Sequence, residues 1–306
     1  MMPTVIAAAE LFSNQAPALS DAGRSWLAEG DSWFTLGSLN LAQNTNMLLA
    51  LQLAMRTTIV TCAYPGDTLA HMADPLCNPQ FDSLLRRPNF SSWWQVILIS
   101  GGGNDLIDAA QHRAVHADGH AATLQERVLL TPAEAARHHP GVTGPERYLS
   151  PPGWQLFAQY IVRNYSALVA RRDEGPSKGQ PILVHTYSVP VVRPSGTVGS
   201  PRGWLFAAMT DYGIARDEHQ GVADFLFNQL RLVLLSLDTD SGSADALPNL
   251  HVFDSASSVR LMPANPNSTG VSGDWVNEIH PNREGYVKIG RAMGPWIERL
   301  LSARYS

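Results

Sequence analysis

The hydrophobic positions of the chain form short continuous runs, separated by stretches in which apolar residues recur at helical spacing. Continuous apolar runs of about four to eight residues are typical of strands buried on both faces of a parallel sheet. Five segments fit this pattern, and the first of them is the least apolar. We predict strands over residues 25–31, 57–63, 95–101, 181–187 and 250–256.

Apolar residues at intervals of three and four lie between the later strands and indicate amphipathic helices. The clearest helix is predicted over residues 154–172. Two more are marked by apolar residues between 226 and 237 and between 289 and 300. Pro295 is expected to kink the last helix, because proline removes a backbone donor and clashes with the preceding turn.

An earlier helix is indicated by apolar residues at the same spacing, with Asn40 available as its N-cap. The series consists of Met47, Leu48, Leu51 and Met55. Strands that alternate with helices along a chain predict a three-layer α/β domain with a mostly parallel sheet, here of five strands.

Two long insertions interrupt this alternation. Residues 111–152 are rich in His, Ala and Pro, and residues 188–220 are rich in Pro and Gly. Both follow strand ends, or the helix after one, so we expect them to overhang the carboxyl edge of the sheet, where ligands bind in open α/β folds. No repeat or linker divides the chain, and we predict a single domain over residues 1–306.

Composition narrows the function classes. The chain has 306 residues, of which 44% are hydrophobic and 16% are charged, an ordinary balance for a globular protein with a sizeable core. A net charge of −5 without any basic run argues against nucleic acid and anionic membranes as partners. No apolar run approaches the roughly 18 residues of a membrane helix, so no stable membrane insertion is expected.

The N-terminal segment and the cysteines bear on location. Residues 1–12 lack a basic region, and their apolar run ends at Glu10, so we expect no signal peptide. Cys62 and Cys77 are too few for a disulfide scaffold and form no C-x-x-C pair. A reducing, cytoplasmic location is therefore predicted.

The tripeptide Gly30-Asp31-Ser32 directly follows the first strand and raises the question of a serine nucleophile. The same tripeptide is typical of a turn, so its interpretation depends on partners elsewhere in the chain. A nucleophilic serine needs a base within hydrogen-bond reach and donors for the oxyanion. The best candidate base is His280, because Pro281 favours a chain break and the following helix would hold the histidine near the same edge.

Candidate oxyanion donors follow two other strands. Gly66 lies in the stretch AYPGDTL, and Asn104 lies in SGGGND. Because the carboxyl ends of parallel strands meet at one edge of a sheet, these groups are expected at the same crevice as Ser32 and His280.

Taken in order, these four blocks resemble those of the SGNH, or GDSL-type, hydrolases over residues 28–290. The resemblance implies a flavodoxin-like α/β/α fold and the hydrolysis of carboxylic esters through an acyl-enzyme. It implies that Ser32 is the nucleophile and His280 the base. It also implies three oxyanion donors, which are the backbone N–H groups of Ser32 and Gly66 and the side-chain amide of Asn104. No cofactor is expected.

One position departs from the family's pattern. The family usually has Asp three residues before the histidine, where its carboxylate holds the imidazole, and this chain has Asn277. An Asn carbonyl can accept the Nδ1–H bond but offers no negative charge. Three partners for His280 stay open: Asn277 through its side chain or backbone carbonyl, Asp274, or a group elsewhere. Glu278 is expected to point away.

Several other residues carry weaker signals. The first insertion holds histidines at a spacing that could suit zinc on a helix, but a glycine weakens the helix and no third ligand is evident, so no metal is expected. These histidines are His112, His116, His120, His138 and His139.

Three aromatic side chains are weighed as site residues. His185 is interpreted as a packed strand residue rather than a second base. Trp33 follows Ser32 directly, and it either packs in the core or lines a substrate pocket. Trp204, in the second insertion, is a candidate lid residue that contacts substrate.

The favoured function is a serine ester hydrolase that acts on a small-molecule ester, with short-chain acyl or acetyl esters as the expected class. A lysophospholipase or thioesterase of the same chemistry is the alternative substrate class. A non-catalytic binding protein on the same scaffold, suggested by Asn277, and an acyltransferase are the alternatives in other classes. The oligomeric state is left open.

Overall fold

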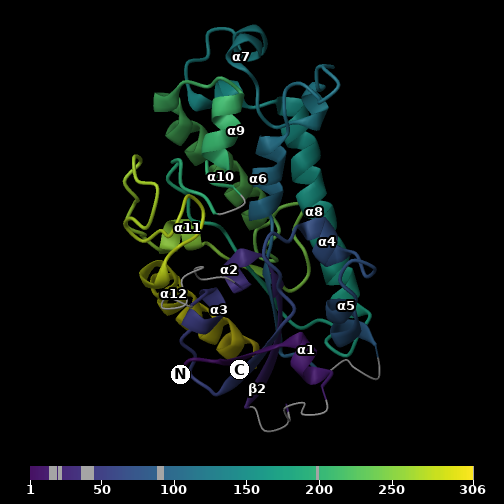
Figure 1. The fold of residues 1–306 in the computed structure, drawn as a ribbon. Helices are drawn as coiled ribbons and strands as arrows, with labels where there is room; N and C mark the ends of the chain where they lie inside the picture. Colours follow the sequence, from purple (N-terminus) through teal and green to yellow (C-terminus); the bar gives the residue numbers. More distant parts are fainter. Residues whose placement is uncertain (14–18, 20–22, 36–44, 88–92, 198–199, 306) are drawn as a thin grey trace.

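A parallel sheet forms the centre of the protein (Figure 1). The computed structural model describes residues 1–13, 19, 23–35, 45–87, 93–197 and 200–305. Within these residues the sheet has six strands, β1 (Thr4–Ala7), β2 (Arg24–Gly30), β3 (Thr57–Thr61), β4 (Val96–Ser100), β5 (Ile182–His185) and β6 (Leu250–Phe253). Their order is β1-β3-β2-β4-β5-β6, and every neighbouring pair is parallel. Without β1, this is the strand order of a flavodoxin-like sheet.

The sequence pattern did not predict β1, so the expectation of five strands is wrong. β1 lies at the edge and pairs with β3, from Thr4 opposite Thr58 to Ala7 opposite Thr61. None of its four residues is fully buried, and its apolar run continues directly into helix α1 (Ala8–Leu11). No change in the spacing of hydrophobic residues therefore marks where the strand ends. The three-layer α/β architecture with a parallel sheet is confirmed.

Helices cover both faces of the sheet. In Figure 1, α3 (Met47–Ala50) and α12 (Arg283–Tyr305) lie on one side, and α4 (Leu69–Ala73), α5 (Pro79–Arg86) and α8 (Pro151–Asp173) lie on the other. α10 (His219–Ser236) packs against α8. The remaining helices within the described residues are α2 (Ser32–Thr35), α6 (Gly103–Gln111), α7 (Pro132–His138), α9 (Leu205–Asp211) and α11 (Ser255–Ser258), with 3₁₀ turns at Leu124–Glu126, Pro145–Tyr148 and Arg216–Glu218.

The three long predicted helices are present as α8, α10 and α12. Their apolar series fall on buried positions, such as Leu226 and Leu230 in α10 and Ile289 in α12. α12 continues through Pro295 as one helix of 23 residues.

The predicted helix around residues 47–55 is a single turn. Its N-cap is Asn46, whose side chain accepts the backbone N–H of Leu49 at 3.0 Å. Asn40, the predicted cap, lies outside the described residues. Beyond Leu51 the backbone bonds to other elements, and the Ala54 N–H donates to the Glu298 carboxylate of α12 at 2.9 Å. These tertiary hydrogen bonds replace the ones that a longer helix would make.

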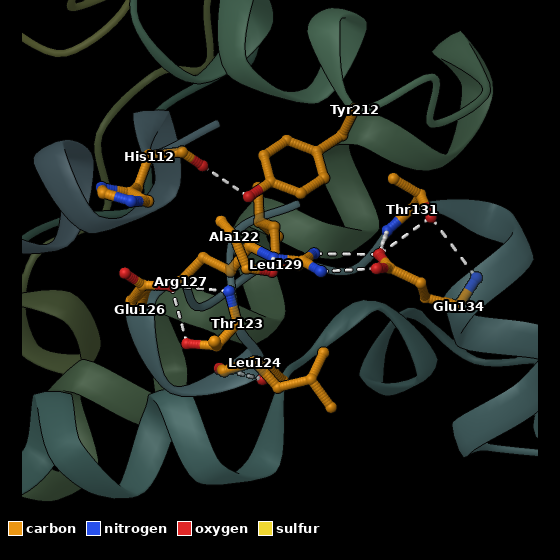
Figure 2. A network of polar contacts seen from close by, with 11 residues as sticks. His112, Ala122, Thr123, Leu124, Glu126, Arg127, Leu129, Thr131, Glu134 and Tyr212 are labelled. Carbon is orange, nitrogen blue, oxygen red and sulfur yellow. Dashed lines mark hydrogen bonds and ion pairs between the residues drawn. The ribbon is translucent and has the colours of Figure 1, made fainter. Parts of the chain in front are cut away.

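Both insertions lie beyond the carboxyl ends of the strands, as expected, with α7 farthest from the sheet (Figure 1). Figure 2 shows how the first insertion is held together around the buried guanidinium of Arg127. Arg127 pairs with Glu134 at 2.9 Å and donates to the carbonyl of Leu129 at 3.0 Å. The hydroxyl of Tyr212, at the end of α9, donates to the carbonyl of His112. This bond ties the first insertion to the second.

No helix in the described part of the chain is long and apolar enough to cross a bilayer. The single domain, the cytoplasmic location and the small-molecule partner stay predictions.

Candidate active site

Ser32 lies at the carboxyl end of β2, where it is the first residue of the short helix α2. The carboxyl group of Asp31 caps this helix, because its Oδ1 accepts the backbone N–H of Trp33 at 2.9 Å. The hydroxyls of Ser100 and Tyr187 also donate to Asp31, at 2.8 and 2.6 Å. These bonds hold the carboxyl group in the interior, where burial raises the pKa of Asp31 to about 6.

Ser32 and His280 are 248 residues apart in the chain and form a direct hydrogen bond. The Ser32 Oγ lies 2.7 Å from Nε2 of His280. The other ring nitrogen, Nδ1, lies 3.0 Å from Oδ1 of Asn277. The loop between β6 and α12 therefore brings His280 and Asn277 to the end of β2, and the three side chains form one chain of hydrogen bonds.

The backbone fixes the orientation of the Asn277 amide. Its Oδ1 also accepts the backbone N–H groups of Ile279 at 3.1 Å and His280 at 2.9 Å. Since a backbone N–H can only donate, the atom that they contact must be the amide oxygen. An oxygen that faces Nδ1 requires the ring proton to be on Nδ1. Nε2 is then left with a lone pair directed at the Ser32 hydroxyl.

Asp274, the second candidate partner, has other contacts. Its carboxylate accepts the backbone N–H of Met262 and pairs with Lys288 of α12, both at 2.5 Å. The backbone carbonyl of Asn277 is also occupied, because it accepts a hydrogen bond from the guanidinium of Arg193 at 2.8 Å. Of the partners left open by the sequence, the Asn277 side chain is the one in contact with Nδ1.

The surroundings of His280 favour its neutral form. Burial lowers the pKa of His280 to about 4, against about 6.5 for a free side chain. A carboxylate at position 277 would oppose this shift, but the Asn277 amide carries no charge. Among the described residues, no carboxylate accepts a hydrogen bond from the ring. The ring is therefore a neutral hydrogen-bond acceptor at physiological pH.

The three candidate oxyanion donors lie at the ends of neighbouring strands. Gly66 follows β3, Ser32 follows β2, and Asn104 lies in the first turn of α6 after β4. One hydrogen of the Asn104 amide donates to the carbonyl of Asp67 at 3.0 Å, which leaves the second available. Within the described residues, the backbone N–H groups of Ser32 and Gly66 make no hydrogen bond. All three donors border the cavity that contains His280.

Two cavities meet at Ser32. The larger has a volume of about 340 Å³, and its wall includes His280, Trp204, Thr197 and Val276. The smaller has a volume of about 20 Å³ and is lined mainly by apolar and aromatic side chains: Trp33, Ile107, Tyr187, Pro190 and Phe227. Ser32, Asn104 and Ile279 border both cavities.

The two tryptophans named from the sequence line different cavities beside Ser32. Trp33 is 4% exposed, packs in the core against Tyr187 and His185, and reaches the smaller cavity. Trp204 lines the larger cavity, with its ring centroid 5.7 Å from that of His280 and the ring planes at 84°. His185 is fully buried and contacts the Ser100 hydroxyl through Nε2 at 2.9 Å, which fits a packed strand residue.

The histidines of the first insertion make several different contacts. The rings of His112 and His116 contact each other edge to face, and His139 Nε2 lies 3.0 Å from the carbonyl of Leu149. In the described part of the chain, three potential metal ligands come within 4.8 Å of one another at a different place, formed by Asp238, Asp240 and His251.

Sequence reasoning missed two residues beside the site. Glu278 points away from His280, as expected, but its buried carboxylate accepts backbone N–H groups of Leu205 at 3.0 Å and Phe206 at 2.8 Å. Arg193, also buried, holds the carbonyl of Asn277. No motif signals either contact, because in each the two partners lie more than 70 residues apart in the chain and one of them offers only a backbone group.

No protein-family model matches the sequence, and no curated protein matches it either. Solved structures do resemble it. A possible lipase from Chitinophaga pinensis has a TM-score of 0.50 at 11% identity, over 90% of this chain and 98% of that one. An extracellular lipase from Streptomyces rimosus has a TM-score of 0.47 at 13% identity, and a putative arylesterase from Agrobacterium tumefaciens has 0.44 at 17%. Both comparisons cover 90% of this chain and 99% of the other.

At these identities the likeness concerns the fold. The chain has a three-layer α/β/α fold with a parallel sheet, and it shares this fold with the possible lipase from Chitinophaga pinensis.

Proposed function

We propose that the protein is a serine hydrolase that cleaves short-chain carboxylic esters through an acyl-enzyme. The observation that carries the proposal is the 2.7 Å contact between Ser32 Oγ and His280 Nε2, with Nδ1 held by Asn277. A serine hydroxyl is a weak nucleophile, and a neutral imidazole in this position can remove its proton.

In the first step, Nε2 of His280 takes the hydroxyl proton while Ser32 Oγ attacks the ester carbonyl. The backbone N–H groups of Ser32 and Gly66 and the Asn104 amide donate to the oxyanion that forms. The Asn277 oxygen accepts the Nδ1–H and keeps the ring in the required tautomer. It stabilises the imidazolium less than a carboxylate would, so the barrier is higher than that of a Ser–His–Asp triad.

The collapse of the tetrahedral intermediate needs a proton on the leaving alcohol, and the imidazolium of His280 supplies it. The alcohol must therefore leave on the side of His280, which assigns it to the larger cavity with Trp204. The acyl group is then assigned to the smaller cavity, which also borders Ser32. Water, activated by the same histidine, then hydrolyses the acyl-enzyme and releases the acid.

The size of the smaller cavity favours an acetyl group. A cavity of about 10–15 Å³ is large enough for one water molecule. The smaller cavity beside Ser32 has a volume of about 20 Å³. It has room for a methyl group but not for an extended acyl chain. The side chains of Ile107 and Phe227 line this cavity.

The nucleophile is tested with a fluorophosphonate probe and intact-mass measurement. We expect one adduct on the wild-type protein and none on Ser32→Ala. An unlabelled wild-type protein would favour the non-catalytic binding protein, and labelling that persists in Ser32→Ala would assign the nucleophile to another residue.

The acyl class is tested with p-nitrophenyl esters of increasing chain length. We expect kcat/KM for the acetate to exceed that for the hexanoate by about 100-fold, because the longer chain must displace packed side chains. Phe227→Ala should enlarge the smaller cavity and so lower the ratio of kcat/KM for the acetate to that for the hexanoate. A hexanoate that is hydrolysed as fast as the acetate by the wild-type protein would refute the assignment of the acyl group to this cavity.

A further inference from the structure

The second insertion holds the loop that carries Asn277 and His280. The Arg193 guanidinium donates to the carbonyl of Asn277 at 2.8 Å. The next backbone N–H, that of Glu278, donates to the carbonyl of Ser195 at 2.7 Å. These contacts hold both polar groups of the peptide bond that joins Asn277 and Glu278.

The Glu278 side chain makes the most extensive contact. Its Oε2 accepts the backbone N–H groups of Trp204 and Leu205, the latter at 3.0 Å. Its Oε1 accepts the N–H of Phe206 at 2.8 Å and that of Arg193 at 3.4 Å. The first three donors belong to the start of α9, so a fully buried carboxylate ties this helix to the histidine loop.

The backbone around this carboxylate leaves no room for another side chain. Gly203 has φ +78°, a conformation that suits glycine. A Cβ at this position would lie 2.6 Å from Oε2 of Glu278 and 2.9 Å from the carbonyl of Arg193. The turn before Trp204 is therefore shaped around the Glu278 carboxylate.

Trp204 is the residue through which this contact reaches the site. Its backbone N–H is bound by Glu278, and its ring stands edge to face with His280 and lines the larger cavity. We propose that Glu278 is a positioning residue that holds Trp204 against His280 and thereby sets the width of the cavity for the leaving alcohol. This inference rests on the proposed function, because it assumes that an ester is cleaved at Ser32.

The contact needs the ionised form of Glu278. A carboxylate can accept all four hydrogen bonds, whereas a protonated carboxyl group or an amide presents a donor to one of the N–H groups. Burial raises the pKa of Glu278 to about 7, although the backbone N–H groups oppose the shift. Among the described residues, the charged group that interacts with it is the Arg193 guanidinium. As pH falls through about 7, the carboxylate gains a proton and the hold on Trp204 weakens.

The wild-type protein allows a first test. KM and kcat are measured for 1-naphthyl acetate and methyl acetate between about pH 5 and pH 9. We expect KM for the naphthyl ester to rise about tenfold towards pH 5, the size of effect that one charge-assisted hydrogen bond provides. The methyl group of methyl acetate is too small to reach Trp204, so KM for this ester should stay constant. The same KM profile for both esters would overturn the proposal.

The second test is a double-mutant cycle on the naphthyl ester at about pH 9. Glu278→Gln should raise KM about tenfold in the wild-type background and less than about twofold in Trp204→Ala, because the effect acts through Trp204. The matched control is Glu284→Gln, the same change at an exposed position of α12, which should leave KM unchanged. Equal effects in both backgrounds would refute a role through Trp204. If Glu278→Gln does not fold, the pH series on the wild-type protein still decides.

The two proposals fail in different ways. A wild-type protein that hydrolyses neither ester refutes the proposed function. Hydrolysis of both esters, with a KM that is independent of pH and of residue 278, refutes only the positioning role of Glu278.

Discussion

Replacing Asn277 by Asp tests the most unusual feature of the site, a histidine held by a neutral amide. The Asn277 Oδ1 lies 3.0 Å from Nδ1 of His280, and two backbone N–H groups hold it there. Asp has nearly the same shape, so its carboxylate oxygen should occupy the same position. The substitution therefore adds a negative charge beside the imidazole with little change in packing.

The expected size of the effect follows from the geometry. Two charges about 4 Å apart interact by about 4 kcal/mol at an effective dielectric constant of about 20, which corresponds to about 3 pKa units. The cost of burying the new carboxylate reduces this, so we expect a rise of about 1–3 units. The pKa of His280, about 4 in the native protein, should move to between about 5 and 7. The imidazolium of the transition state is stabilised as well, and we expect kcat/KM at about pH 8 to rise by about 3- to 30-fold.

The assay is the pH profile of kcat/KM for methyl acetate, the ester whose KM is expected not to depend on the protonation of Glu278. Because His280 must be neutral to accept the proton, activity falls as pH drops through its pKa. As pH is lowered, the native protein should keep its activity down to about pH 5. The Asn277→Asp variant should begin to lose activity earlier in this series, because the pKa of its His280 is higher. Asp274→Asn is the control, because Asp274 pairs with Lys288 and not with the ring. An acid limb that does not move in Asn277→Asp, or that moves in Asp274→Asn, would refute the assignment of Asn277 to Nδ1.

Three further predictions follow from individual contacts. Asn104→Ala should lower kcat for p-nitrophenyl acetate by about 10²–10³-fold with little change in KM, and a loss below about threefold in steady-state kinetics would argue against an oxyanion role. Gly66→Ala should lower the free energy of unfolding in urea by about 1–2 kcal/mol, because an added Cβ meets no atom within 4 Å but φ is +81°. The Arg127 side chain lowers the pKa of Glu134 to about 2, so this ion pair stabilises the fold above about pH 4.5 and is lost as pH falls towards 2. Glu134→Gln should therefore lower Tm at pH 7 and flatten its fall in acid, and an unchanged Tm profile would contradict this.

The strands that carry the candidate site could be predicted because their physics is local. β4 is buried along its whole length, and β3 buries its apolar centre, Ile59 and Val60. A parallel sheet then brings the ends of neighbouring strands together without any further information. This is why Ser32, Gly66 and Asn104 could be expected at one edge from their positions in the chain.

Other parts of the fold depend on contacts that have no local signature. The edge strand β1 has no alternation of its own, and α3 ends early because Glu298 of α12 binds the Ala54 N–H. The Glu278 carboxylate is bound by backbone N–H groups, which every residue but proline has. The side chains in the sequence therefore could not reveal these partners. The sequence also could not decide whether Asn277 or Asp274 is the partner of His280, because this depends on the conformation of their loop.

The last helix has a practical consequence for how the protein can be attached to other objects. α12 begins three residues after His280 and continues for 23 residues, which at 1.5 Å per residue spans about 35 Å. Its end lies towards the opposite edge of the sheet from α2 and the insertions (Figure 1). A resin, an electrode or a fused carrier protein joined after Tyr305 would thus face away from the opening at Ser32, and esters in the bulk liquid would still reach it.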